Sequence, residues 1–314
     1  MRRGTDMLSR TADNLFWAAR YLERAEGLAR LIEMGQRMTM IPGAGRQEWR
    51  SVAAAAGAGH LFAKEERVNE AAIVQQLLLT DSHPMSIRYC LNRARENARA
   101  VRTSFTQEMW EALNDGWRRL EMVDERSAVR ELPTLLEWVK TRASMFRGAT
   151  QTTMLRNDRY FFLRLGSLIE RVDLTLRLLD VKYYVLLPES DVVGGGRDHH
   201  QWTSILHAIS AAKSYHHQYR GDYSPWFIAD FLILNQQFPR SVAYSYGEIV
   251  WHLDQLAKAY GQTHDCHRLA ADMVQQLDNT DMNKLFQNGL HTFTTEAIGH
   301  NNLLSREISR AYNF

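Results

Sequence analysis

The pattern of apolar and polar positions predicts helices along nearly the whole chain. Apolar side chains recur at the three-to-four-residue period of an α-helix over residues 15–32, 73–79, 87–105, 135–145, 161–179, 205–215 and 250–260. No stretch alternates between apolar and polar residues with hairpin turns at its ends. The sequence therefore predicts an all-α fold, a helical bundle of about a dozen helices.

Prolines and one polar stretch mark the expected breaks between helices. Pro84 and Pro239 suit the first turn of a helix, where a missing N–H costs nothing. Pro42 and Pro188 follow long helical patterns and are expected to end them. The sequence "NDG" at 114–116 predicts a further break.

Three landmarks recur in the same order after roughly 150 residues, a period far longer than that of a solenoid repeat. "YLERAEGLAR" from Tyr21 corresponds to "LIERVDLTLR" from Leu168, "WRSVAAAAG" to "WTSILHAIS", and "HPMSIRYCL" to "FPRSVAYSY". The repetition predicts two tandem units, residues 1–152 and 153–314, related by a pseudo-two-fold axis.

Composition narrows the classes of function. Lys and Arg number 38 against 36 Asp and Glu, so the net charge of +2 provides no strong basic field, and we expect no nucleic-acid partner. No apolar run reaches the ~18 residues of a membrane helix and no secretory signal is visible, so we expect no membrane association. Cys90 and Cys266 are not spaced as a metal or redox motif, which favours a cytoplasmic location.

The repeated Glu-Arg helices carry the candidate chemistry. At helical spacing, Glu23 and Arg30 share a stripe with small and apolar residues, and Glu170 and Arg177 repeat this arrangement. Gly166, one turn before Glu170, lets another backbone approach closely, so we expect these charges to be partly desolvated and paired. They form either an ion-pair network that sets the register of the two units or a cleft in which arginines bind a carboxylate or phosphate. The substrate-binding candidates are Arg20, Glu23, Arg24, Arg30, Glu170, Arg171 and Arg177.

The chain resembles the Alpha-E family of bacterial helical proteins, which takes its name from a Glu-Arg motif. The resemblance covers nearly the whole chain and is carried by "MLSRTADNLFWAARYLERAEGLARLIE", "RGATQTTMLRNDRYFFLRLGSLIERVDLTLRLLD" and "FLILNQQFPRSV". The motif falls on Glu23-Arg24 and Glu170-Arg171. Ala19 departs from the glycine that often precedes the first arginine.

The resemblance implies a role in making or breaking amide bonds, because family members are typically encoded beside, or fused to, circularly permuted ATP-grasp proteins and transglutaminase-like proteins. We expect a helical accessory or substrate-holding partner of an ATP-grasp enzyme. One alternative is an enzyme in its own right, with Glu23 or Glu170 as general base, which a raised glutamate pKa would favour. Another is a structural homo-oligomer.

The histidine pairs and one aromatic segment lead to two further predictions. The histidine pairs lack the Glu-x-x-His spacing of a di-iron bundle, so we predict no metal and no cofactor. The segment "SYHHQYRGDYSPWF", with a glycine-rich connection at 194–196 before it, predicts a partner surface, for which simple loop drift is the alternative. Its candidate residues are Tyr215, His216, Tyr219 and Tyr223.

Overall fold

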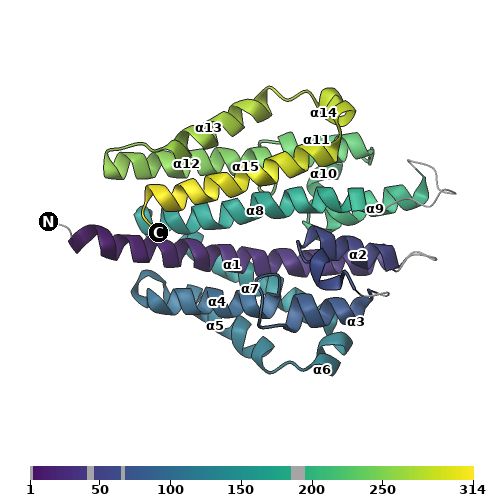
Figure 1. Cartoon of the computed structure of the whole chain (residues 1–314), viewed down its shortest axis with the longest axis horizontal. Helices are drawn as coiled ribbons and strands as arrows, with labels where there is room; N and C mark the ends of the chain where they lie inside the picture. The colour runs from purple at the N-terminus through teal and green to yellow at the C-terminus, as the bar shows by residue number, and fades with distance from the viewer. Residues whose placement is uncertain (1–2, 41–45, 65–67, 185–194) are drawn as a thin grey trace.

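The computed structural model describes residues 3–40, 46–64, 68–184 and 195–314 and is all-α, as predicted (Figure 1). Within these residues it contains fifteen α-helices, three short 3₁₀ or π turns and no strand. The first half comprises α1 (Arg3–Thr39), α2 (Arg46–Ala55), α3 (Glu70–Ile73), α4 (Ile87–Ala100), α5 (Gln107–Glu121), α6 (Glu125–Arg130) and α7 (Leu132–Thr153). The second half comprises α8 (Asp158–Tyr184), α9 (Gly196–Ala208), α10 (Ala212–Tyr219), α11 (Pro225–Leu234), α12 (Val242–Tyr260), α13 (Asp265–Asp278), α14 (Met282–Asn288) and α15 (Leu290–Ala311).

The two long helices α1 and α8 lie side by side in the middle of the molecule (Figure 1). Helices α4 and α7 pack on α1, whereas α12 and α15 pack on α8. The second helix of each half contacts the central helix of the other half, so that α2 packs on α8 and α9 packs on α1. The α1–α8 contact is therefore the layer through which the two halves meet.

The close approach of α1 and α8 depends on a glycine, as the sequence predicted. A Cβ atom at Gly166 would lie 2.2 Å from the carbonyl oxygen of Phe16, which is much closer than van der Waals contact. On either side of this point, Phe16, Ile32 and Leu168 are fully buried in the common core. Each such side chain contributes about 1.5–3 kcal/mol of burial free energy, as an upper bound.

Several predicted helix limits were wrong for local reasons. The predicted helix 87–105 ends at Ala100, because Val101 leaves helical geometry with φ −126°. The predicted helix 205–215 is two helices, separated at Ser210, whose φ is 59°. The segment 73–79 is mostly a π-helix, Val74–Leu79. The expected break at 114–116 lies inside α5, where Gly116 is buried.

The prolines also differ from the prediction. Pro84 and Pro239 lie before α4 and α12 rather than in their first turns, and the N-cap positions belong to Ser86 and Ser241. The Ser241 side chain accepts a hydrogen bond from the backbone N–H of Tyr244, which satisfies a free donor at the start of the helix. Pro42 and Pro188 lie outside the described residues.

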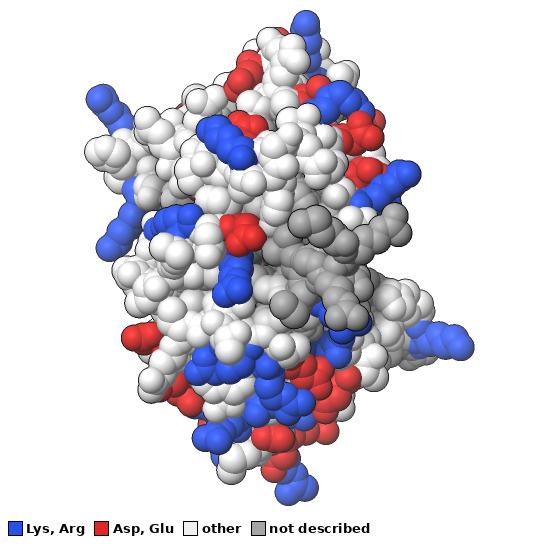
Figure 2. All heavy atoms as spheres, turned by 90° about the vertical axis from the view of Figure 1, so that its left-hand side faces the viewer, with Lys and Arg blue, Asp and Glu red and all other residues white. Residues whose placement is uncertain are grey.

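The surface agrees with the near-neutral composition. On the face shown in Figure 2, basic and acidic side chains are interspersed. Within the described part of the chain, no helix has the length and apolar character needed to cross a membrane.

Candidate functional site

A layer of charged side chains lies between α1 and α8, and it contains all seven candidates from the sequence. Glu23 and Glu170 are buried, with 2% and 3% of their surfaces exposed. The arginine of each Glu-Arg pair reaches across to the glutamate of the other pair. Arg24 donates from Nε and Nη2 to the two carboxylate oxygens of Glu170, and Arg171 donates from Nε and Nη2 to those of Glu23. Both contacts are bidentate forks, the strongest form of Arg–carboxylate pairing.

On one side of this layer lies the Glu23 cluster, which comprises Glu23, Glu26, Arg30, Arg147, Arg171 and Arg240. Glu26 is fully buried and accepts hydrogen bonds from three arginines: Arg30 at 2.6 Å, Arg240 at 2.7 Å and Arg147. Glu23 also forms ion pairs with Arg147 at 3.3 Å and Arg240 at 3.6 Å. Four arginines therefore surround two carboxylates and fill the space around them.

On the other side lies the Glu170 cluster, which comprises Arg20, Arg24, Glu170, Asp173 and Arg177. Arg20 donates to Glu170 at 3.0 Å and to the Ser305 hydroxyl at 2.7 Å. Arg177 donates from Nε to Asp173 at 2.5 Å. In this cluster three arginines face two carboxylates, and the Asp173 side chain is 14% exposed.

The two clusters bind the helices of the opposite half in the same way. Arg30 donates from Nη1 to the carbonyl of Ala208, the last residue of α9. Arg177 donates from Nη1 to the carbonyl of Ala55, the last residue of α2. An arginine at a helix C-terminus satisfies a free carbonyl and interacts favourably with the helix dipole. Each cluster thus fixes one helix of the other half.

The glutamates at the centre of both clusters are ionised at neutral pH. Burial by itself would raise the pKa of Glu23 and of Glu170, but the arginines outweigh burial and lower both values to about 2. A general base needs a pKa near the working pH. The lowered pKa values therefore do not favour either glutamate as a general base.

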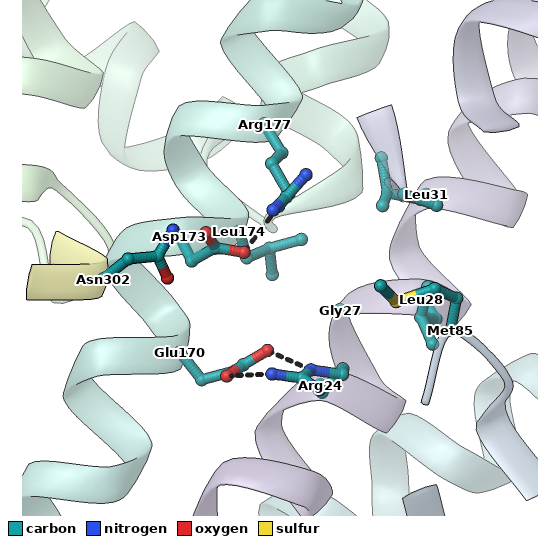
Figure 3. Close-up of a pocket in the computed structure, with 11 residues that line it drawn as sticks. Arg24, Gly27, Leu28, Leu31, Met85, Glu170, Asp173, Leu174, Arg177 and Asn302 are labelled. Atoms are coloured by element: carbon teal, nitrogen blue, oxygen red, sulfur yellow. Dashed lines mark hydrogen bonds and ion pairs between the residues drawn. The ribbon is translucent and has the colours of Figure 1, made fainter. Parts of the chain in front are cut away.

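The Glu170 cluster opens into a cavity of about 230 Å³ (Figure 3). Figure 3 shows Glu170, Asp173 and Arg177 on α8 and Arg24 reaching from α1 to Glu170, with Leu28, Leu31 and Met85 across the cavity from α8. Asn302 is exposed. The cavity is lined by Arg24, Gly27, Leu28, Leu31, Ala56, Met85, Glu170, Asp173, Leu174, Arg177 and Asn302.

Of the sequence-predicted binding residues, Arg24, Glu170 and Arg177 line this cavity, whereas Arg20, Glu23, Arg30 and Arg171 do not. Six further residues of the layer and cavity were not predicted: Glu26, Met85, Arg147, Asp173, Arg240 and Asn302. The sequence held a signal for two of them, because Glu26 and Asp173 each lie three residues after the glutamate of a Glu-Arg pair. Met85 and Arg240 lie in the similar segments "HPMS" and "FPRS", but no sequence signal links them, Arg147 or Asn302 to the charged layer.

The predicted partner surface is wrong for Tyr215. Its ring is fully buried, stacked on Tyr219 with 4.9 Å between the ring centroids, and its hydroxyl donates to the Asp222 carbonyl. Tyr215→Ala would therefore remove core packing rather than surface contacts. Tyr219 and Tyr223 are half-buried and His216 is exposed, so a partner surface there stays a prediction. Residue 194 of the glycine-rich connection lies outside the described residues.

Comparison with known proteins places the charged layer within the span of a family profile. No curated protein and no solved structure matches this chain. The profile of the Alpha-E family, described as a predicted alpha-helical domain with a conserved ER motif, matches residues 7–312. The two Glu-Arg pairs within that span are the residues that cross between α1 and α8. The chain therefore belongs to the Alpha-E family.

Proposed function

We propose that this protein is a substrate-holding partner of an ATP-grasp amide-bond-forming enzyme, and that it holds a substrate carboxylate in the cavity of the Glu170 cluster. The observation that carries the proposal is the pair of arginines at this cavity, each with part of its guanidinium unused. Arg24 binds Glu170 through Nε and Nη2, and Arg177 binds Asp173 and Ala55 through Nε and Nη1. No described residue accepts a hydrogen bond from Arg24 Nη1 or Arg177 Nη2.

The charge balance supports an anionic group on the ligand. Three arginines face two carboxylates in the Glu170 cluster, which leaves one positive charge in excess. A charge removed from water is favoured when it is paired and hydrogen-bonded. A carboxylate matches the planar donor geometry of guanidinium groups.

The volume limits the size of the ligand. Pockets for drug-sized molecules have volumes of about 300–1,000 Å³. The cavity, at about 230 Å³, lies below this range. An amino acid or the end of a peptide suits such a site, and both are substrates of amide-bond formation.

We also propose that the two halves are copies of one unit and that the Glu23 cluster has a structural role. The reciprocal Arg24–Glu170 and Arg171–Glu23 contacts support the duplication, as do the matching contacts of Arg30 with α9 and Arg177 with α2. The Glu23 cluster, in which arginines occupy the space around both carboxylates, would then fix the register of the halves and hold the second cluster in place.

The ATP-grasp partner rests on the family resemblance, which also suggests a transglutaminase-like protein. The test combines this chain with an ATP-grasp protein encoded beside it and measures ATP turnover and amide product with and without the chain. We expect the chain to raise turnover and Arg177→Gln to reduce that gain at least tenfold. Arg37→Gln is the matched control, because it removes an arginine in a partly exposed ion pair with Glu33 that does not line the cavity. Turnover that is the same with and without the chain would contradict the partnership.

A further inference from the structure

The two clusters are equivalent in position but differ in the side chains that enter them. Within the repeated motif "HPMS" and "FPRS", Met85 corresponds to Arg240. The helices α7 and α15 both have 22 residues, and alignment from their first residues, Leu132 and Leu290, places Arg147 opposite Ser305. Two arginines of the Glu23 cluster are therefore replaced by a methionine and a serine in the Glu170 cluster.

These replacements change how the second carboxylate of each cluster is neutralised. Glu26 has Arg30 on its own helix and the additional guanidinium groups of Arg147 and Arg240. Asp173 has Arg177 on its own helix and no further cation within ion-pair distance among the described residues. The side chains that would supply those cations are short or neutral here, and the cavity lies beside Asp173. The Glu170 cluster thus has both space and an underused carboxylate where the Glu23 cluster has arginines.

We propose that the ligand is a free α-amino acid with an apolar side chain, bound as a zwitterion. This inference rests on the proposed function. The ammonium group binds Asp173, in the role that Arg147 and Arg240 have beside Glu26. The carboxylate binds Arg24 and Arg177, and the side chain packs against the apolar wall of the cavity.

The mixture of charges in the cavity distinguishes a zwitterion from a simple anion. A carboxylate held by Arg24 and Arg177 also lies near the carboxylates of Glu170 and Asp173, which repel it. An ammonium group on the adjacent carbon offsets that repulsion and satisfies Asp173. A simple anion has no group for Asp173, and a simple cation leaves the spare arginine donors unpaired.

The apolar wall across the cavity from α8 favours an apolar side chain on the ligand. Leu28, Leu31 and Met85 line this wall, Leu174 adds an apolar side chain from α8, and the three leucines have 6% or less of their surfaces exposed. A neutral apolar side chain gains burial free energy against this wall, whereas a charged side chain loses hydration without a partner. We therefore expect leucine-like amino acids to bind better than lysine or glutamate.

Isothermal titration calorimetry of the whole chain with L-leucine and three analogues tests the inference. N-acetyl-leucine lacks the ammonium group, leucine amide lacks the carboxylate, and Leu-Leu separates the two charges. We expect L-leucine to bind and each analogue to bind at least tenfold more weakly. Equal binding of N-acetyl-leucine and leucine would overturn the zwitterion while a carboxylate site remained. Equal or tighter binding of Leu-Leu would overturn the free amino acid in favour of a peptide, and equal or tighter binding of leucine amide would rule out the carboxylate contact. Absence of binding by all four would contradict both this inference and the proposed holding role.

Met85→Arg locates the site, because an arginine there reproduces Arg240 of the other half. We expect a guanidinium group to enter the cavity, reach Asp173 and reduce leucine affinity more than tenfold with the melting temperature preserved. Met122→Arg is the matched control at a methionine that is 86% exposed, and it should bind as the unmodified chain does. Unchanged leucine affinity in Met85→Arg would place the ligand elsewhere and overturn the inference.

Asp173→Asn provides a second variant in case Met85→Arg does not fold. It removes the charge that faces the ammonium group and leaves Arg24 and its fork with Glu170 in place. We expect leucine affinity to fall about tenfold and the weak affinity for N-acetyl-leucine to stay the same or rise. An equal loss of affinity for both ligands would show that Asp173 does not recognise the ammonium group.

Discussion

The Glu23 cluster and the Glu170 cluster are both centred on α1 and α8, yet the carboxylates of the first are enclosed by four arginines, whereas those of the second line a cavity. Both contain a Glu-Arg fork from the opposite helix and an arginine that binds the end of a helix in the other half. Arg147 and Arg240 enter the first cluster, whereas Ser305 and Met85 border the second. The side chains of Glu26 and Asp173 are accordingly 1% and 14% exposed.

On our proposal, the charged layer has a structural role at the Glu23 cluster and a binding role at the Glu170 cluster. Buried ion pairs contribute little net stability, since the cost of desolvation offsets much of the attraction, but loss of one partner leaves a buried charge unpaired. A cluster in which every group is held by protein is therefore fixed by its own neighbours. Asp173 has one protein cation, Arg177, where Glu26 has three, and we propose that a ligand supplies another.

The largest expected effect contrasts the second carboxylate of each cluster. Glu26→Gln leaves Arg30, Arg147 and Arg240 without their shared carboxylate, and we expect a loss of about 3–5 kcal/mol in the free energy of unfolding. Asp173→Asn removes one partly exposed i,i+4 pair and should cost at most about 1 kcal/mol. Urea unfolding of both variants measures the two losses. Equal losses would show that the two clusters do not differ in the way described.

The central glutamates should instead behave alike. Glu23→Gln and Glu170→Gln each remove the charge from a buried fork, so each should cost about 3 kcal/mol. Urea unfolding of the two variants side by side provides the comparison. One pKa unit corresponds to about 1.4 kcal/mol. A difference of more than about 2 kcal/mol between the two losses in the free energy of unfolding would therefore contradict the equivalence of the forks.

The charged layer and another buried group, His252, should affect stability over different pH ranges. Its ring lies among Tyr160, Phe161 and Trp251, and neither ring nitrogen has a hydrogen-bond partner among the described residues. Burial, with a smaller effect of Arg164 and Arg156, lowers the pKa of His252 to about 3.

As the pH falls below 6.5, His252 becomes protonated in the unfolded chain but stays neutral in the folded protein. The free energy of unfolding therefore falls as the pH is lowered from 6.5 towards 3. At pH 5 the loss is about 2 kcal/mol relative to neutral pH. The glutamates of the layer have pKa values lowered from 4.5 to about 2, so their contribution is lost only below pH 4.5. Unfolding free energies from pH 7 to pH 4.5 should show a slope that His252→Gln reduces. An unchanged slope would contradict the assignment of this pH dependence to His252.

The smallest expected effect concerns the loops that follow α2 and α9. Gly57 follows α2 and Ser210 follows α9, and both have positive φ, 73° and 59°. Glycine adopts this geometry without strain and serine does not. Gly57→Ser should destabilise the protein by about 1 kcal/mol. Ser210→Gly relieves the strain but removes the hydrogen bond that Arg30 donates to the Ser210 hydroxyl at 3.3 Å, so it should change stability by less than about 0.5 kcal/mol. Thermal unfolding measures both changes, and a loss in Ser210→Gly as large as that in Gly57→Ser would contradict the strain at residue 210.

The sequence predicted the helices and the charged layer because both depend on local spacing. Helical periodicity identified the segments that became α1 and α8, and the small residue at 166 indicated where another backbone approaches. The cavity depends instead on residues that tertiary packing brings together. Met85 and Asn302 come from different parts of the chain, and no local pattern places either beside Asp173. Tyr215 was misassigned because its ring packs in the core against Tyr219 and Phe231, which no local pattern indicates.

A crystal structure determined with L-leucine bound would test most directly whether the two clusters differ in function. The zwitterion should occupy the cavity of the Glu170 cluster, with its ammonium group on Asp173 and its carboxylate on Arg24 and Arg177. The Glu23 cluster in the same crystal should hold only its four arginines. Leucine bound elsewhere with the Glu170 cavity vacant, or bound equally at both clusters, would contradict the proposal that Ser305 and Met85, in place of arginines such as Arg147 and Arg240, leave room for the binding site.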